Sequence, residues 1–464
     1  DLRRAAHEAW IARGAHPGPH DNRPLIPEIL ALRAERARLL GFASFAAFRL
    51  SDSMAGTPDA ARGLLEQVWE PGRRKAAAEH DRLLALARSE GMEDTLQSGV
   101  QQPGTQQPGV RQPGALQPWD WRHYGERVRR ADYALDAAET KPFFVLERIQ
   151  QAAFDCATRL FGVTFTLLED VPLYHPDVSA FEVRDADGHV GVFLADPFAR
   201  PDKRSGAWMS SFRDQEGMDG AISPIIVNNN NFARGEPTLL SFDDGRTLFH
   251  EFGHALHGLL SRVRYPGQSG TSVRRDFVEF PSQVFEHWFA LPETLRSYAR
   301  HHETGAPIPD ATIERLLAAR SWGQGFSTVE YTASALIDMA LHGESDPGAI
   351  DVEAYECDFL ARLGMPSAIG IRHRPAHFQH LFAGGGYAAG YYAYLWAEVL
   401  DADGFEAFEE AGDPFDPATA ARLHAVLAAG DTADPMALYV GFRGRAPRTE
   451  ALLRGRSLLA PRKA

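Results

Sequence analysis

One segment, residues 247–258, constrains this chain more than any other because it fits a helix that carries metal ligands. It contains the pattern His250-Glu251-x-x-His254. Residues four apart lie one turn above each other on the same face of an α-helix. The rings of His250 and His254 can therefore each direct a nitrogen at one zinc ion, at about 2.0–2.1 Å. The pattern is typical of a helix that binds catalytic zinc.

Glu251 lies one position further round this helix and suits a different role. A carboxylate beside the open position of the metal can take a proton from water instead of binding the metal. The opposite face is apolar, as expected for a half-buried helix, and carries Leu248, Phe252, Ala255, Leu256 and Leu259. The spacing of His257 does not fit a third ligand, so we interpret it as a structural or supporting residue. The alternative is a buried helix whose two histidines only form hydrogen bonds.

A catalytic zinc site takes a third protein ligand and leaves the fourth position to water. Residues 275–283 enter the next helix and offer Asp276 and Glu279, with Glu286 further along. Pro281 is tolerated only in a first helical turn, which places Glu279 near the start of that helix. Spacing alone leaves all three carboxylates open, and each is also consistent with a helix cap or a surface position.

A second unusual segment, residues 380–396, joins three successive glycines to a cluster of tyrosines. The glycines predict a flexible loop that carries phenol donors. Tyr387, Tyr391 and Tyr394 are four and three apart, which predicts one helical face. A tyrosine stripe at helical spacing is more often packing than catalysis, so the pattern alone does not assign a role.

We expect a single catalytic region over residues 1–464, with a helical part at 1–162, a mixed part at 163–290 and a second helical part at 291–464. Within the first part, residues 97–118 repeat Gln-Pro-Gly. This polar segment lacks core-forming residues and predicts a disordered or extended surface loop inserted between two helices.

The mixed part shows a strand-like period. The candidate strands are residues 163–168, 181–184, 190–194 and 222–228, with a turn at 185–188 between the second and third. The run from Asn228 to Asn231 follows the last strand. It fits either a polar strand edge that pairs with an extended peptide or an ordinary turn.

Composition excludes several partners. The net charge of −14 argues against a nucleic acid or an anionic membrane, both of which attract basic surfaces. No uninterrupted apolar run approaches the ~18 residues that span a bilayer. Two cysteines cannot form a disulfide framework, so we expect a cytoplasmic, reducing compartment. We also expect a monomer. The chain begins at Asp1 inside a helical pattern, and we expect a fragment or a processed product.

Four segments together resemble the thimet oligopeptidase family of zinc peptidases, and most of all its bacterial peptidyl-dipeptidases (dipeptidyl carboxypeptidases). They occur in the family's order and spacing, and they are residues 206–211, 247–258, 275–283 and 384–396. The likeness covers essentially the whole chain apart from the Gln-Pro-Gly insertion. Family members usually carry a further N-terminal helical region, which is absent from this sequence.

The resemblance implies one zinc ion per chain, held by His250, His254 and Glu279. His380, Tyr387 and Tyr394 match residues of the family that contact substrate, with Tyr391 a weaker match. The implied fold is mainly α and zincin-like, with two helical lobes around a deep channel. A small β-sheet beside the zinc helix would contain the strand at 222–228.

The implied function is zinc-dependent hydrolysis of short unstructured oligopeptides, with Glu251 as the base and release of dipeptides from the C-terminus. One alternative is an endo-acting oligopeptidase of the same family. Another, of a different class, is an inactive peptide-binding fragment. No residue that would bind a substrate's C-terminus can be located in the sequence, so the mode of cleavage stays open.

Overall fold

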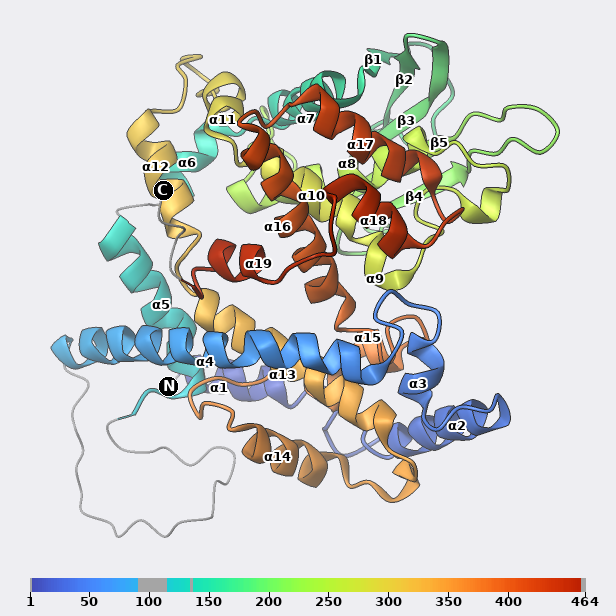
Figure 1. The fold of residues 1–464 in the computed structure, drawn as a ribbon. Coiled ribbons are helices and arrows are strands. Elements are labelled where there is room, and N and C mark those ends of the chain that lie inside the picture. Colours follow the sequence, from blue (N-terminus) through green and yellow to red (C-terminus); the bar gives the residue numbers. More distant parts are fainter. Residues whose placement is uncertain (1, 91–114, 134–136, 460–464) are drawn as a thin grey trace. The chain divides into compact units, whose positions relative to one another are not determined.

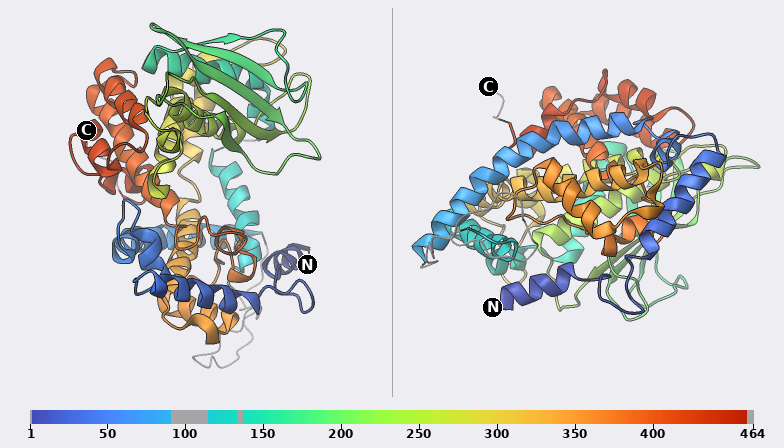
Figure 2. Two further views of the ribbon diagram at one scale, coloured as in Figure 1. Left: turned by 90° about the vertical axis from the view of Figure 1, so that its right-hand side faces the viewer. Right: turned by 90° about the horizontal axis from the view of Figure 1, so that it is seen from below.

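The computed structural model describes residues 2–90, 115–133 and 137–459, which form two compact units (Figure 1, Figure 2). One unit comprises residues 1–134, 318–392 and 453–464, and the other comprises residues 135–317 and 393–452. Each unit therefore combines segments that are far apart in the sequence. Most of the predicted Gln-Pro-Gly loop, residues 97–114, lies outside the described residues.

The first unit is built on two long helices, α4 (Pro58–Ser89) and α13 (Gln324–Gly343), which pack against each other (Figure 1). Helix α4 begins at an N-cap, Thr57, and continues through Pro71. The other helices of the first unit, within the described residues, are α1 (Leu2–Ile11), α2 (Leu25–Leu39), α3 (Phe45–Leu50), α5 (Pro118–Tyr133), α14 (Val352–Leu363), α15 (Gln379–Phe382) and the 3₁₀ turns η3 (Pro347–Ala349) and η4 (Pro375–His377). Helices α2, α4, α5, α13 and α14 share one apolar core that includes Trp69, Trp121 and Ile337.

The second unit contains a five-stranded sheet in the order β1-β2-β3-β5-β4. Figure 2 shows this sheet in green. The strands are β1 (Thr164–Leu167), β2 (Ser179–Asp185), β3 (Gly188–Phe198), β4 (Trp208–Arg213) and β5 (Ile225–Phe232). Only the β3–β5 pairing is parallel. The four predicted strands are present, and the turn at 185–188 joins β2 to β3. β4 was not predicted, and it forms one edge of the sheet.

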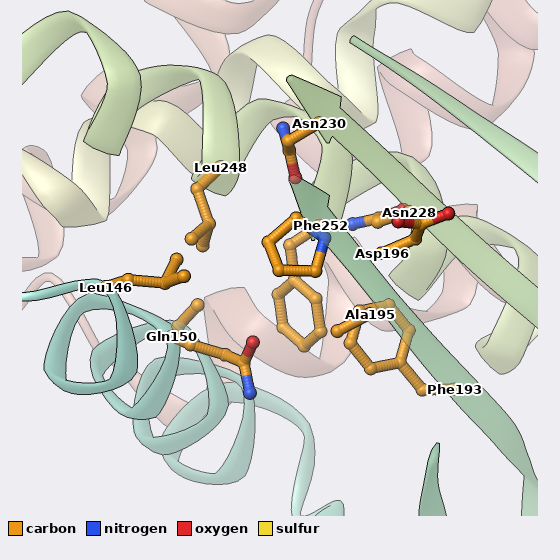
Figure 3. Close-up of a pocket in the computed structure, with 11 residues that line it drawn as sticks. Leu146, Gln150, Phe193, Ala195, Asp196, Asn228, Asn230, Leu248 and Phe252 are labelled. Carbon is orange, nitrogen blue, oxygen red and sulfur yellow. The ribbon is translucent and has the colours of Figure 1, made fainter. Parts of the chain in front are cut away.

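The predictions for the asparagine run were wrong, because Asn228 to Asn231 lie inside β5, between β3 and β4. Alternate side chains face opposite sides of a strand. The amide of Asn231 donates to the carbonyls of Arg204 and Gly206, at 2.8 and 2.6 Å, and so holds the segment that leads into β4. Asn228 and Asn230 instead line a small cavity against Leu248 and Phe252 (Figure 3).

Asp196 on β3 anchors the same segment. Its carboxylate is buried and accepts hydrogen bonds from Arg200 at 2.7 Å, Lys203 at 2.9 Å and Tyr174 at 2.9 Å. Burial raises the pKa of Asp196, but these bonds outweigh burial and lower the pKa to about 2. The segment between β3 and β4 is therefore held by a buried charge and by Asn231.

Helix α8 (Phe242–Leu260) packs against β3, β4 and β5 (Figure 1). It starts at a capping box in which Ser241 and Asp244 satisfy each other's backbone amides. Phe252, on its apolar face, contacts Phe154, Phe193 and Phe285 with ring centroids 5.2–5.8 Å apart. The predicted apolar stripe thus fixes α8 between the sheet and neighbouring helices.

The remaining helices of the second unit surround this core. They are α6 (Ala137–Thr140), η1 (Lys141–Phe143), α7 (Leu146–Phe161), η2 (Pro266–Gln268), α9 (Arg275–Val278), α10 (Phe280–Phe289), α11 (Pro292–Tyr298), α16 (Ala393–Ala411), α17 (Pro417–Ala429) and α18 (Pro435–Arg443). The unit boundaries fall within α12 (Asp310–Ala319) and α19 (Glu450–Gly455). Among the described residues, no helix combines the length and apolarity that a membrane span requires.

The structure confirms a mainly α-helical chain with one small sheet beside the histidine helix. The predicted channel between two lobes stays a prediction.

Candidate metal centre

Three side chains converge at the face of α8 that carries the histidines. The Nε2 atoms of His250 and His254 each lie 3.3 Å from Oε2 of Glu279. Glu279 is the residue that ends α9 and begins α10. The three ligand atoms lie within 4.8 Å of one another, so this group could hold a metal ion.

The spacing of these atoms fits zinc. Two ligand atoms bonded to one zinc at tetrahedral angles lie roughly 3.3–3.5 Å apart, since each bond is about 2.0–2.2 Å long. The separation of 3.3 Å from Glu279 to each histidine falls in this range. Two histidines and one glutamate are also a donor set of catalytic zinc sites, which leave a fourth position open.

A glycine lets Glu279 approach the histidines. A Cβ atom at Gly253 would lie 2.6 Å from the carbonyl oxygen of Pro281 and 2.7 Å from Cα of Ser282. Only a glycine therefore permits α10 to begin this close to α8. Ser282 then donates to the backbone carbonyl of Glu279 at 2.8 Å, and it lies 3.3 Å from the carboxylate.

The other two candidate ligands lie elsewhere. Asp276 is fully buried on α9 and is not part of the three-residue cluster. Glu286 accepts a hydrogen bond from Nδ1 of His250 at 2.8 Å, and its second oxygen pairs with Arg246 at 2.7 Å. With a metal ion on Nε2, Nδ1 would carry the ring proton and donate it to Glu286, so Nε2, which faces the cluster, would offer its lone pair to the metal.

Buried charges shift the titration of this group. Burial raises the pKa of Glu286, but the bond from His250 and the charge of Arg246 outweigh it and lower the pKa to about 2. Burial disfavours the charged form of His250 and so lowers its pKa, but its hydrogen bonds to Glu279 and Glu286 outweigh burial and raise the pKa to about 10. The sequence left Glu286 as a candidate ligand and did not predict that it would accept a hydrogen bond from His250. Its spacing of seven from Glu279, two helical turns, places both on one face and was the available signal.

Glu251 is buried beside the cluster, with only 5% of its surface exposed. Burial raises the pKa of its carboxyl, and the charges of His250 and His254 with a hydrogen bond from the backbone of Met209 partly offset this. Met209 belongs to β4, so the edge strand contacts the candidate base. His257 is fully buried, and burial lowers its pKa to about 3, which keeps the ring uncharged.

The glycine–tyrosine segment, residues 380–396, begins in the first unit and ends in the second. His380, on α15, and Tyr387 belong to the first unit, whereas Tyr394 lies on α16 in the second. The rings of His380 and Tyr387 are 5.6 Å apart, and the ring of Tyr391 lies 5.3 Å from His380. The structure thus brings His380 and Tyr387 together.

The prediction of one helical face for the three tyrosines was wrong. Helix α16 begins at Ala393, so of the three only Tyr394 is helical. Ala389 has a left-handed backbone with φ of 53°, and its amide bonds to the carboxylate of Asp338. This long-range bond replaces the local bond that a helix would have formed.

A helix bearing His-Glu-x-x-His, with a glutamate donor from a second helix, is the arrangement of zincin-like metallopeptidases. Residues 1–458 match peptidase family M3, and the chain belongs to this family. This family is the one that the sequence motifs predicted.

Two curated relatives show the likeness in detail. Dipeptidyl carboxypeptidase of Escherichia coli (strain K12) is 40% identical over 447 residues, which are 95% of this chain and 62% of the relative. Oligopeptidase A of the same organism is 36% identical over 468 residues, 97% of this chain and 65% of the relative. The chain thus spans about three fifths of the length of these relatives.

Proposed function

We propose that this chain is the catalytic region of a zinc-dependent peptidase that hydrolyses short, unstructured oligopeptides. The observation that carries the proposal is the convergence of His250, His254 and Glu279, each histidine 3.3 Å from the glutamate, with Glu251 buried beside them. Membership of peptidase family M3 supports the same activity. Because the chain spans only part of its relatives' length, the activity of the whole protein belongs to the proposal as well.

The proposed ligands are His250, His254 and Glu279, with Glu286 fixing the ring of His250. Bound zinc would supply a Lewis acid that polarises the scissile carbonyl and lowers the pKa of water toward ~7. Glu251 accepts the proton that the attacking water loses as its oxygen bonds to the carbonyl carbon. Glu251 then delivers this proton to the leaving amine as the C–N bond breaks.

His380, Tyr387 and Tyr394 are the proposed substrate-contacting residues. A phenol or imidazole N–H can donate to the carbonyl oxygen as negative charge develops on it. Loss of one such donor typically costs about 10²–10³ in rate.

The finer proposal is release of dipeptides from free C-termini, which the 40% identity to dipeptidyl carboxypeptidase supports. The 36% identity to oligopeptidase A favours the alternative, cleavage within the peptide. The third alternative, a non-catalytic peptide-binding protein, predicts no zinc at the site. We also propose a reducing compartment such as the cytoplasm, which the free Cys156 and Cys357 support. A monomer is proposed as well.

A product map tests the proposal. One peptide of about ten residues, with a free and with an amidated C-terminus, is incubated with the zinc-loaded protein and with protein treated with a chelator. Dipeptides from the free peptide only, abolished by the chelator, support C-terminal dipeptide release. Internal fragments from both peptides support the endo-acting alternative. Hydrolysis that persists without zinc, or no hydrolysis with zinc, would refute the proposal.

A further inference from the structure

The segment that carries His380 and Tyr387 is fastened by a buried carboxylate on another helix. Asp338 lies on α13 and is fully buried. Its Oδ1 accepts the amide of Ala389 and its Oδ2 accepts the amide of Tyr391, both at 2.9 Å. Neither amide bonds within a helix, because α16 starts only at Ala393. Asp338 therefore satisfies two backbone donors that this segment would otherwise bury unpaired.

The bond to Ala389 fixes an unusual backbone conformation. Ala389 has φ of 53°, in the left-handed region that residues with a Cβ atom rarely adopt. Such a conformation persists only when surrounding contacts determine it, and such residues cluster at functional sites. Tyr387, the proposed substrate contact, lies two residues before it.

Tyr391 transmits this restraint to His380. Its amide bonds to Asp338, and its carbonyl oxygen accepts a hydrogen bond from the hydroxyl of Tyr331 on α13. Its buried ring contacts His380 at 5.3 Å and Phe378 at 4.8 Å. A shift of the Tyr391 backbone would therefore move the ring that supports the exposed His380.

The same carboxylate belongs to a chain of buried groups. His342 lies 2.8 Å from Asp338 through Nδ1 and 2.9 Å from the guanidinium of Arg33 through Nε2. A guanidinium can only donate, so Nε2 accepts and Nδ1 carries the proton that is donated to Asp338. Arg33 also donates to the carbonyls of Leu381 and Gly384, at 2.7 and 3.1 Å.

We propose that Asp338 is a positioning residue, which holds the backbone of residues 389–391 so that His380 and Tyr387 meet the substrate in a fixed geometry. This inference rests on the proposed peptidase function. The glycine-rich segment, predicted as a flexible loop, is held at Gly384 through Arg33 and at residues 389–391 through Asp338. Asp338 acts through Tyr391 and touches neither substrate nor metal.

The test compares Asp338→Asn with a matched control, Glu79→Gln. Glu79 on α4 is also a buried carboxylate that accepts two backbone amides, those of Gly325 and Phe326, each at 3.0 Å. It holds the start of α13 instead of the glycine–tyrosine segment. The full chain is measured by amide hydrogen exchange with peptide resolution, by zinc content and by steady-state peptide hydrolysis.

Asp338→Asn should accelerate exchange in residues 386–391 and leave zinc content unchanged. It should lower kcat by about 10²-fold, the typical effect of a misplacement of about 1 Å, with a smaller change in KM. Glu79→Gln should accelerate exchange at residues 325–326 and leave kcat within about twofold of the parent protein. Ala389→Gly, added to Asp338→Asn, should restore part of kcat because glycine adopts positive φ without strain.

Unchanged exchange in residues 386–391 of Asp338→Asn would overturn the proposal. Equal losses of kcat in Asp338→Asn and Glu79→Gln would also overturn it, because the effect would then be general destabilisation. If the parent protein with zinc hydrolyses no peptide, the proposed function fails, and the exchange comparison still decides whether Asp338 holds the segment.

Discussion

Replacing Gly253 with alanine adds a methyl group at the point where α8 meets the start of α10. The new Cβ atom would lie 2.6 Å from the carbonyl oxygen of Pro281 and 2.7 Å from Cα of Ser282. Both contacts are backbone atoms, so no side chain can rotate away to relieve them. The start of α10 must therefore retreat by roughly 0.5–1 Å to reach ordinary van der Waals contact.

This retreat moves Glu279, which precedes Pro281 by two residues. Ligand distances at metal sites fit within about ±0.2 Å, so the displacement exceeds what the site accepts. We expect zinc affinity to fall at least about 10–100-fold, comparable with the loss of a group that orients a ligand. Overpacking should also cost about 1–3 kcal/mol of stability, against a gain of about 0.5–1 kcal/mol from replacing a helical glycine.

Gly441 supplies the control, since it is a helical glycine of the same unit. It is exposed on α18, and a Cβ atom there meets nothing within 4 Å. Gly441→Ala should raise stability by about 0.5–1 kcal/mol and leave zinc affinity unchanged. Competition with a chromophoric chelator measures affinity, and urea unfolding of the zinc-free protein measures stability. If Gly253→Ala binds zinc like the parent protein and is as stable as Gly441→Ala, the close approach of α10 to α8 does not depend on Gly253.

The remaining predictions concern single side chains. Glu286→Gln should weaken zinc binding by about 10–100-fold, because a neutral amide supports the ring of His250 less well; unchanged affinity in a chelator titration would contradict this role. Glu251→Gln should retain zinc yet lose nearly all turnover in a peptide assay, and retained hydrolysis would remove Glu251 as the base. Tyr394→Phe should lower kcat more than KM in steady-state kinetics, whereas an effect on KM alone would make it a binding residue. Asp196 has a lowered pKa, so the stability it confers is present above its ordinary value of 3.8 and is lost as pH falls toward about 2. Between about pH 4 and 2, the free energy of unfolding measured in urea should fall by about 2 kcal/mol less in Asp196→Asn than in the parent protein. An equal fall in both proteins would contradict this prediction.

Local sequence signals were sufficient for much of the second unit. The apolar stripe of α8, the hairpin turn at 185–188 and the position of Pro281 in the first turn of α10 all follow from short-range rules. β4 was missed because its exposed residues Ser210 to Arg213 show no apolar alternation. It is a strand because it pairs with β5, a partner distant enough that no local pattern reports it.

The residues of the candidate site were also predictable only where a local sequence pattern reports them. The helical spacing of His250 and His254 predicted a shared face, and the structure places both beside Glu279. Choosing Glu279 over Glu286 required a family resemblance, because the choice depends on how α10 is oriented against α8. The helical face proposed for the tyrosines failed at Ala389, whose amide bonds to Asp338, 51 residues earlier in the chain.

Anomalous diffraction at the zinc absorption edge, from crystals of the zinc-loaded protein, locates the metal and its ligands. We expect one zinc peak in the candidate site, bonded at about 2.0–2.2 Å to Nε2 of His250, Nε2 of His254 and a carboxylate oxygen of Glu279. A zinc-loaded crystal with no peak there, or with Asp276 or Glu286 in place of Glu279, would contradict it.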